Sequence, residues 1–206
     1  NNGGVDPHID NMLRITSDGK KLALDPRLYA ENGQDEAGNK LNECAKRVFE
    51  IWADTADIQG TQIIFCDLST PKKKFEDYVP GTDFDAYNEL KYKLVQRGIP
   101  KDEIAYIHDP KNEKEKQALF DELNEGTVRV IIGSTEKCGA GANLQKKLVA
   151  LHHLDTPYRP ADMEQREGRI VRQGNENEDV KIFTYVTQRT FDSYSYQILE
   201  NKQRFI

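Results

Sequence analysis

Short apolar runs alternate with amphipathic segments along most of the chain. An apolar run of about five residues, bounded by polar or glycine-containing stretches, is typical of a strand. Such runs predict five strands, over residues 62–66, 104–108, 128–132, 148–154 and 180–186. Several of them are apolar almost throughout, which favours strands that are covered on both faces.

The segments around these runs predict helices. Apolar side chains first recur at helical spacing at Leu41, Ala45, Val48 and Trp52, and they predict a helix of about four turns. Further helices are predicted over residues 84–96, 112–123, 162–171 and 189–203. Alternation of strands and helices predicts an α/β fold, with a parallel sheet and helices on both of its faces. Ligands of such folds bind at the carboxyl ends of the strands.

The first 38 residues differ from the rest, because they lack sustained periodicity and contain several glycines and two prolines. We interpret residues 1–38 as an extension or linker that packs through short apolar patches, such as Met12-Leu13 and Leu22–Leu24. The sequence therefore predicts two parts, an N-terminal extension over residues 1–38 and a folded domain over residues 39–206.

Composition narrows the class of protein. The chain is 37% hydrophobic and 31% charged, it holds no apolar run that could span a bilayer, and its first residues do not form a signal peptide. Membrane association is therefore not expected. Cys44, Cys66 and Cys138 lie far apart without CxxC spacing, which favours buried apolar side chains over metal ligands or disulfides. We predict no metal site and a reducing, cytoplasmic compartment.

The charge distribution restricts contact with nucleic acid to a local surface. The net charge is −6, which is not that of a generally basic nucleic-acid-binding protein. Residues 129–189 nevertheless carry ten Lys/Arg against eight Asp/Glu, whereas residues 1–128 carry seventeen against twenty-five. Any contact with phosphates is therefore expected in the second half of the chain.

A glycine-rich segment, Gly133–Gln145, follows the third predicted strand. Small residues after a buried strand let the backbone approach a ligand closely, and their amides can face an anion. Ser134 and Thr135 add hydroxyl groups suited to phosphate oxygens. Taken alone, the segment is equally compatible with a structural strand-to-helix turn.

An arginine-rich segment, Gln165–Gly174, lies on a predicted helix. Arg166, Arg169 and Arg172 share one helix surface, since their spacing covers less than two turns. That surface could be a solvated, ion-paired face, or a guanidinium cluster directed at phosphates. The spacing alone leaves both alternatives open.

Together the two segments resemble motifs V and VI of superfamily 2 helicases, with the closest resemblance to Swi/Snf-type ATPases. The matching residues are Ser134-Thr135, Gly139, Gly141 and Asn143-Leu144, then Asp155 and Pro160, then Gln165, Gly168-Arg169 and Arg172. Residues 62–67 are similar to motif IV, so the resemblance covers roughly residues 41–200. Departures are Tyr158 and Arg159, where that family often has Trp and Asn, and the Arg-Gln-Gly-Asn end of motif VI.

The resemblance implies the C-terminal RecA-like lobe of an ATP-dependent helicase or nucleic-acid translocase. The 206 residues contain no G-x-x-x-x-G-K-[ST] loop and no acidic DExx box on a predicted strand. ATP would therefore be shared with an N-terminal RecA-like lobe of the same polypeptide, which would also hold the magnesium. Residues 11–28 are similar to regions that join the lobes in large helicase–methylase fusions of mobile elements.

The resemblance also implies roles for individual residues. The arginine fingers would be Arg169 and Arg172. The nucleotide-binding residues would be Gly141, Asn143, Gln165 and Arg166. The contacts to a nucleic-acid backbone, of DNA in preference to RNA, would come from Ser69, Thr70, Ser134 and Thr135.

Two alternatives belong to other functional classes. The segment Asp155–Tyr158 is similar to the D-P-P-Y motif of amino-methyltransferases. The stretch between the glycines and Asp155 is, however, too short for the crossover helix of a cofactor-binding unit. The second alternative is a degenerate RecA-like lobe that serves as a non-catalytic interaction scaffold. The presence of both candidate fingers and of the motif V residues favours the enzyme over the scaffold.

Overall fold

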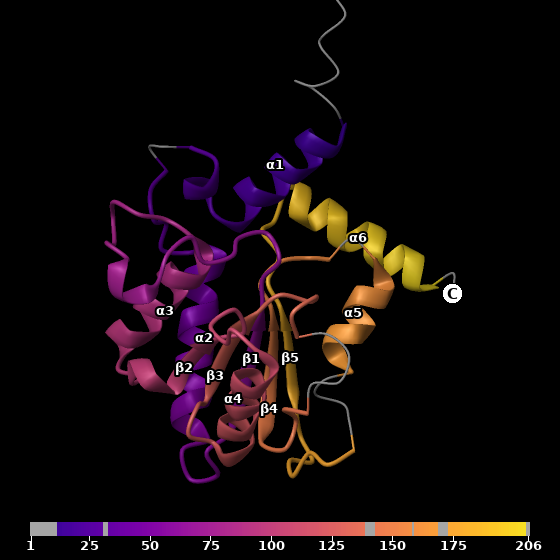
Figure 1. Ribbon diagram of the computed structural model, residues 1–206. Helices are drawn as coiled ribbons and strands as arrows, with labels where there is room; N and C mark the ends of the chain where they lie inside the picture. Colours follow the sequence, from indigo (N-terminus) through magenta and orange to yellow (C-terminus); the bar gives the residue numbers. More distant parts are fainter. Residues whose placement is uncertain (1–11, 31–32, 139–142, 158, 169–172, 205–206) are drawn as a thin grey trace, which may run out of the picture.

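The computed structural model describes residues 12–30, 33–138, 143–157, 159–168 and 173–204. Its centre is a five-stranded sheet in the order β2-β3-β1-β4-β5 (Figure 1), in which every pair of neighbours is parallel. The strands are β1 (Thr61–Phe65), β2 (Ile104–Tyr106), β3 (Val130–Gly133), β4 (Leu148–His153) and β5 (Lys181–Thr184). Every end of the five strands lies within two residues of the end of the predicted run.

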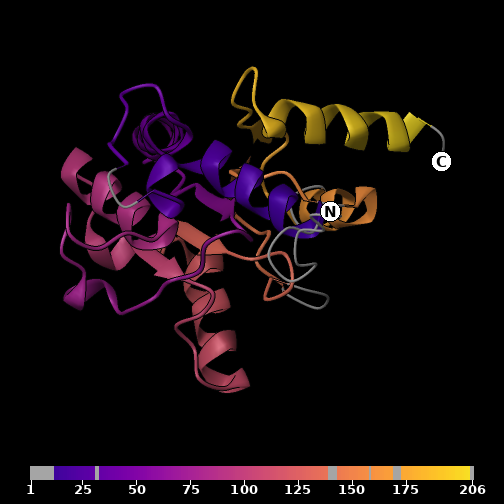
Figure 2. The same cartoon turned by 90° about the horizontal axis from the view of Figure 1, so that it is seen from above.

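Helices cover both faces of the sheet, which confirms the predicted RecA-like α/β fold. Helices α2 (Lys40–Asp54) and α3 (Ala86–Arg97) lie on one face, and α4 (Glu113–Glu125) lies on the other (Figure 2). Consecutive residues of a strand point to opposite faces. Ile64 and Ile132 accordingly pack into the core beside α2 and α3, whereas Ile63 and Ile131 pack beside α4.

Local sequence signals fix both ends of the two crossover helices. The carboxylate of Asp85 accepts a hydrogen bond from the third backbone N–H of α3, and the side chain of Asn112 does the same for α4. Gly98 and Gly126 end the two helices with φ angles of 109° and 82°, in the left-handed region where glycine is favoured. These caps explain why the predicted bounds of both helices are close to the observed ones.

The topology opens a crevice at the carboxyl end of β1. From β1 the chain crosses one face of the sheet through α3 to the edge strand β2. From β2 it crosses the other face through α4 and enters β3, next to β1. A change of direction of this kind is where ligands bind in parallel sheets. The loops that follow β1, β3 and β4 meet at this point, because β1 lies between β3 and β4.

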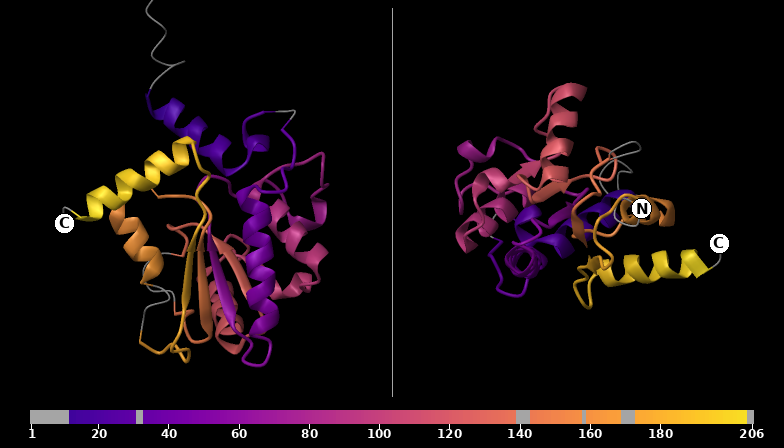
Figure 3. Two further views of the ribbon diagram at one scale, coloured as in Figure 1. Left: turned by 180° about the vertical axis from the view of Figure 1, so that it is seen from behind. Right: turned by 90° about the horizontal axis from the view of Figure 1, so that it is seen from below.

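The N-terminal segment forms a helix that the hydrophobic pattern did not predict. Helix α1 spans Met12–Leu24, and the short 3-10 helix η1 follows over Pro26–Leu28. Figure 3 shows α1 beside α6 (Phe191–Arg204) at the carboxyl end of the sheet. A Cβ on Gly19 would lie 3.2 Å from the Phe191 side chain, so the two helices meet closely at this glycine. Tertiary packing therefore supports this helix, and of its predicted apolar patch Leu24 is buried while Leu22 is half-exposed.

Helix α5 carries the first residues of the arginine-rich segment, up to Glu167. It begins at Pro160, two residues before its predicted start, and is described as far as Glu167. The predicted continuation to residue 171 lies outside the described residues. Of the described helices, none is long and apolar enough to cross a membrane. The thiols of Cys44, Cys66 and Cys138 are all buried, which confirms their predicted burial.

Two adjacent histidines on β4 point to opposite faces of the sheet. His152 Nε2 lies 3.0 Å from Gln62 Oε1, and its Nδ1 lies 2.8 Å from the Tyr185 hydroxyl. The Gln62 amide nitrogen donates to the Val48 carbonyl, so its oxygen faces His152 and requires the tautomer with a proton on Nε2. Burial and the neighbouring His153 lower the pKa of His152 to about 3, so this ring is neutral in the folded chain.

We expect the free energy of unfolding to fall as pH is lowered below about 6.5. Both histidines have pKa values near 3 when folded and near 6.5 when unfolded, so the unfolded state binds more protons throughout this window. Each group contributes a slope of up to about 1.4 kcal/mol per pH unit. Urea unfolding between pH 5 and 8 measures this loss, and His152→Asn should reduce the slope by about one proton. A parental stability that is constant from pH 7 to 5 would contradict the expectation.

Candidate nucleotide and nucleic-acid site

Three loops meet at the carboxyl ends of the central strands. Asp67 follows β1, Thr135 follows β3 and Asp155 follows β4. The Asp67 carboxylate accepts the backbone N–H and the hydroxyl group of Thr135, both at 2.7 Å. The Asp155 carboxylate accepts the backbone N–H of Leu68 at 2.8 Å and that of Asp67. The loop after β1 is therefore bonded to both of its neighbours.

The guanidinium of Arg166, from α5, enters the centre of these loops. Its Nη2 lies 2.7 Å from the Asp67 carboxylate and 2.9 Å from that of Asp155. Nη1 donates to the Asp155 carbonyl at 2.8 Å, and Nε donates to the Thr135 hydroxyl at 2.7 Å. The side chain is 0% exposed and lies over the Phe65 ring at 5.2 Å. We call Asp67, Thr135, Asp155 and Arg166 the Arg166 cluster.

Electrostatic pairing compensates the burial of this cluster. Burial alone would raise the pKa of Asp67, but the Arg166 guanidinium and the Thr135 donors outweigh it and lower that pKa. Burial disfavours the Arg166 cation, yet Asp155 and Asp67 raise its pKa. His153 presents Nδ1 to the guanidinium at 3.4 Å. Burial and Arg166 lower the pKa of His153 to about 3, so the ring stays neutral.

The Arg166 guanidinium points into the lobe. Its donors are bonded to groups of the lobe itself, because two carboxylates lie beneath α5. Any influence of Arg166 on a nucleotide must therefore pass through the loops that it holds. Gly141, Arg169 and Arg172 lie outside the described residues.

A cleft of about 580 Å³ lies next to the Arg166 cluster. It brings together four of the residues that the sequence singled out, Thr70, Ser134, Thr135 and Gln165. It also contains charged and titratable side chains that sequence reasoning did not assign: Asp67, His108, Glu136, Lys137, Arg159 and Asp162. Hydroxyl and ammonium donors therefore share one cavity with carboxylates.

Besides Arg166, two described residues of the predicted site do not line this cleft. The Ser69 hydroxyl accepts the first backbone N–H of α3, from Ala86, at 2.9 Å, and the side chain is buried. The Asn143 side chain accepts from the Gln145 amide at 2.7 Å. Ser69 thus connects the loop after β1 to α3, and Asn143 organises the end of the glycine-rich segment.

The two aspartates were the residues most accessible to sequence reasoning. Asp67 and Asp155 each stand within two residues of the end of a predicted buried strand, where an acidic residue faces the ligand edge of the sheet. In the sequence, Asp155 is identified by the helicase resemblance between motifs V and VI, and Asp67 by its place at the end of motif IV. His108 has no comparable signal, although its ring packs edge-on against Tyr87 at 5.6 Å.

Comparison with known proteins identifies the family. Residues 57–174, more than half of the chain, match the helicase conserved C-terminal domain. The chain belongs to this family. It is the C-terminal lobe of a superfamily 2 helicase, and the helicases of this family are ATP-dependent. The match confirms the resemblance inferred from motifs V and VI. The membership excludes the amino-methyltransferase alternative.

Two curated relatives are similar over part of the lobe. Defense against restriction protein B of Escherichia phage P1 is 33% identical over 85 residues, which are 41% of this chain and 4% of that protein. The uncharacterized ATP-dependent helicase YqhH of Bacillus subtilis is 36% identical over 87 residues, which are 42% of this chain and 15% of that protein. The chain thus spans only a small part of the length of these relatives.

Solved structures support the fold. The C-terminal part of the Fun30 ATPase domain superposes with a TM-score of 0.58 at 18% identity, over 84% of this chain and 50% of that one. The C-terminal domain of the DEAD-box protein Dbp5 superposes with a TM-score of 0.50 at 20% identity, over 78% of this chain and 81% of that one. At these identities the likeness shows the RecA-like architecture alone.

Proposed function

We propose that the chain is the C-terminal half of an ATP-driven nucleic-acid translocase, closest to the Swi/Snf-type ATPases. The observation that carries this proposal is the cleft in which the Thr70 and Ser134 side chains gather beside α5, next to Thr135, whose hydroxyl belongs to the Arg166 cluster. Hydroxyl groups at the carboxyl ends of parallel strands suit the phosphates of a nucleic-acid backbone. Such contacts position a protein on the strand without reading sequence. DNA is favoured over RNA by the Swi/Snf resemblance alone.

The charge of the cleft supports a division of the ATP site between two lobes. Lys137 and Arg159 line the cleft, but Arg159 is paired with Asp162 at 3.0 Å. Asp67 adds a further carboxylate, so these side chains could not neutralise a triphosphate. The phosphates and magnesium would therefore be held by an N-terminal RecA-like lobe of the same polypeptide.

In this division the chain contributes to the side of the nucleotide that faces α5. Arg169 and Arg172 would be the arginine fingers that stabilise charge on the transferred phosphoryl group. Gln165, which lines the cleft, and Gly141 and Asn143 would bind or border the nucleotide. Arg166 would act through the loops of its cluster. The three buried thiols are consistent with action in the cytoplasm, a reducing compartment.

The isolated 206-residue chain is expected to show no ATP turnover, with or without DNA. The longer polypeptide with both lobes is expected to hydrolyse ATP, and DNA should stimulate it. A colorimetric phosphate assay on both proteins, with DNA and RNA of equal length, checks this. Turnover proportional to the concentration of the isolated chain would contradict the division between lobes. A two-lobed protein that neither nucleic acid activates would favour the scaffold.

A further inference from the structure

A buried lysine from the N-terminal segment lies next to the Arg166 cluster. Lys20, on α1, is 3% exposed, and its Nζ donates to the Thr156 carbonyl at 3.0 Å. The carboxylates of Asp155 and Asp192 attract it, and the cations of Arg166 and Lys40 repel it. Lysine is almost never fully buried unless it is paired. The segment that resembled a linker therefore places a charge inside the lobe.

The turn between β4 and α5, which contains Thr156, is also bonded to α6. Asp192 lies in the first turn of α6, is buried, and forms an ion pair with Lys40. One of its carboxylate oxygens accepts the Thr156 hydroxyl at 3.5 Å, and the other accepts the Thr187 backbone N–H at 2.9 Å. Thr156 is thus bonded through its carbonyl to α1 and through its hydroxyl to α6.

Thr156 occupies a sensitive place in the chain. It directly follows Asp155, whose carboxylate and carbonyl both bind Arg166, and it precedes α5 by only a few residues. Displacement of the Thr156 carbonyl would therefore shift the Asp155 backbone and the start of α5 together. Lys20 holds this position from outside the sheet.

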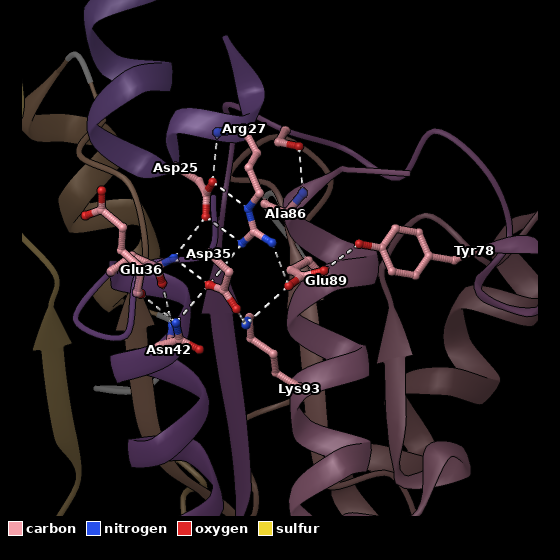
Figure 4. A network of polar contacts seen from close by, with 11 residues as sticks. Asp25, Arg27, Asp35, Glu36, Asn42, Tyr78, Ala86, Glu89 and Lys93 are labelled. Carbon is pink, nitrogen blue, oxygen red and sulfur yellow. Dashed lines mark hydrogen bonds and ion pairs between the residues drawn. The ribbon is translucent and has the colours of Figure 1, made fainter. Parts of the chain in front are cut away.

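The segment that carries Lys20 is itself fixed at its other end. We call residues 12–28, comprising α1 and η1, the N-terminal strap. Arg27 bonds to Glu89 of α3 at 2.9 Å and to the buried Asp25 at 2.8 Å, and its guanidinium lies 4.2 Å from the centre of the Phe84 ring. Figure 4 shows Lys93 and Asp35 closing this network around Arg27. The strap is therefore attached at two charged points.

We propose that Lys20 is a positioning residue for ATP hydrolysis, which holds the turn between β4 and α5 so that α5 faces the nucleotide correctly. This inference rests on the proposed function of the lobe. Lys20 acts through Thr156 and does not contact the nucleotide. In the proposed two-lobed polypeptide the strap would also connect this lobe to the N-terminal lobe, so its position would influence the geometry of α5.

The test compares Lys20→Met with Lys21→Met in the two-lobed polypeptide. Lys21 is the matched control, because it is the next residue of α1 and, among the described residues, Thr156 bonds to Lys20 and Asp192 and not to Lys21. We expect Lys20→Met to lower kcat at saturating ATP and DNA at least ten-fold, with the KM for ATP and the Kd for DNA changed less than two-fold. Lys21→Met should retain the parental values. A merely structural lysine would not separate kcat from KM.

Hydrogen–deuterium exchange supplies a readout that does not depend on activity. In the 206-residue chain, Lys20→Met should increase exchange over residues 155–168 and leave α3 unchanged. If Lys20→Met does not fold, Lys20→Gln is used, since it retains an N–H donor without the charge. A kcat within two-fold of the parent, or unchanged exchange at α5, would overturn the inference for either variant.

Failure of the inference is distinguishable from failure of the proposed function. If the parental two-lobed protein hydrolyses ATP and Arg169→Lys abolishes turnover while Lys20→Met has the parental rate, only the role of Lys20 is wrong. If the parent does not hydrolyse ATP with either nucleic acid, the proposed function is wrong, and the inference fails with it.

Discussion

Arg169→Lys and Arg172→Ala are each expected to cut ATP turnover of the two-lobed protein by two or more orders of magnitude. An arginine finger stabilises the charge on the transferred phosphoryl group and contributes about 10³–10⁵ to the rate. Because this interaction acts mainly in the transition state, the loss should appear in kcat more than in the affinity for ATP. Lysine retains the charge but lacks the planar fork of arginine, so it should not substitute at Arg169.

The control for this experiment is Arg47→Lys. Arg47 lies on α2, away from the cleft, and its side chain is 51% exposed. The same chemical change there should leave turnover at the parental rate. Turnover, ATP affinity and the midpoint of thermal unfolding are measured on the same four proteins. Arginine variants at positions 169 and 172 that both hydrolyse ATP at the parental rate would identify the segment as a solvated, charged surface.

Arg166→Met is expected to lower the free energy of unfolding of the 206-residue chain by about 3–5 kcal/mol, the usual effect of removing one partner of a buried ion pair. The variant would leave the buried Asp155 carboxylate and the partly exposed Asp67 carboxylate without their cation. It would also remove the Nε donor from the Thr135 hydroxyl. The loss would be a large fraction of the total stability of a domain, which is about 5–15 kcal/mol.

Urea unfolding followed by circular dichroism at pH 7 measures this change. The dependence of the free energy on urea concentration should stay constant, so that the midpoint alone reports the loss. Arg159→Met is the matched control, because Arg159 stands at the start of the same helix and its ion pair with Asp162 is exposed. If Arg166 instead faced solvent and bound the nucleotide, the unfolding midpoint of Arg166→Met would be close to that of Arg159→Met.

The sequence by itself determined the class of fold and the place of the site. Apolar runs such as 62–66 and 148–154 are too short for helices and too apolar for a half-exposed sheet, so they predicted strands buried between two layers. Asp85, Asn112, Gly98 and Gly126 fix helix ends through contacts within a few residues, which a linear pattern contains in full. The order of the motif residues likewise placed Ser134, Thr135 and Gln165 at one edge of the sheet.

Only the tertiary structure decided how charges are used at that edge. Helical spacing suggested that Arg166 shares a face with other arginines, but it did not show that Asp67 and Asp155 bind its guanidinium. Asp67 is 99 residues away in the sequence, and Asp155 comes from the loop after β4. The same holds for Lys20, whose partner Thr156 is 136 residues distant. Helix α1 was not predicted from the sequence, and in the fold it packs against α6, where Gly19 meets Phe191. Local periodicity therefore specified the layers, and long-range pairing of buried charges specified the site.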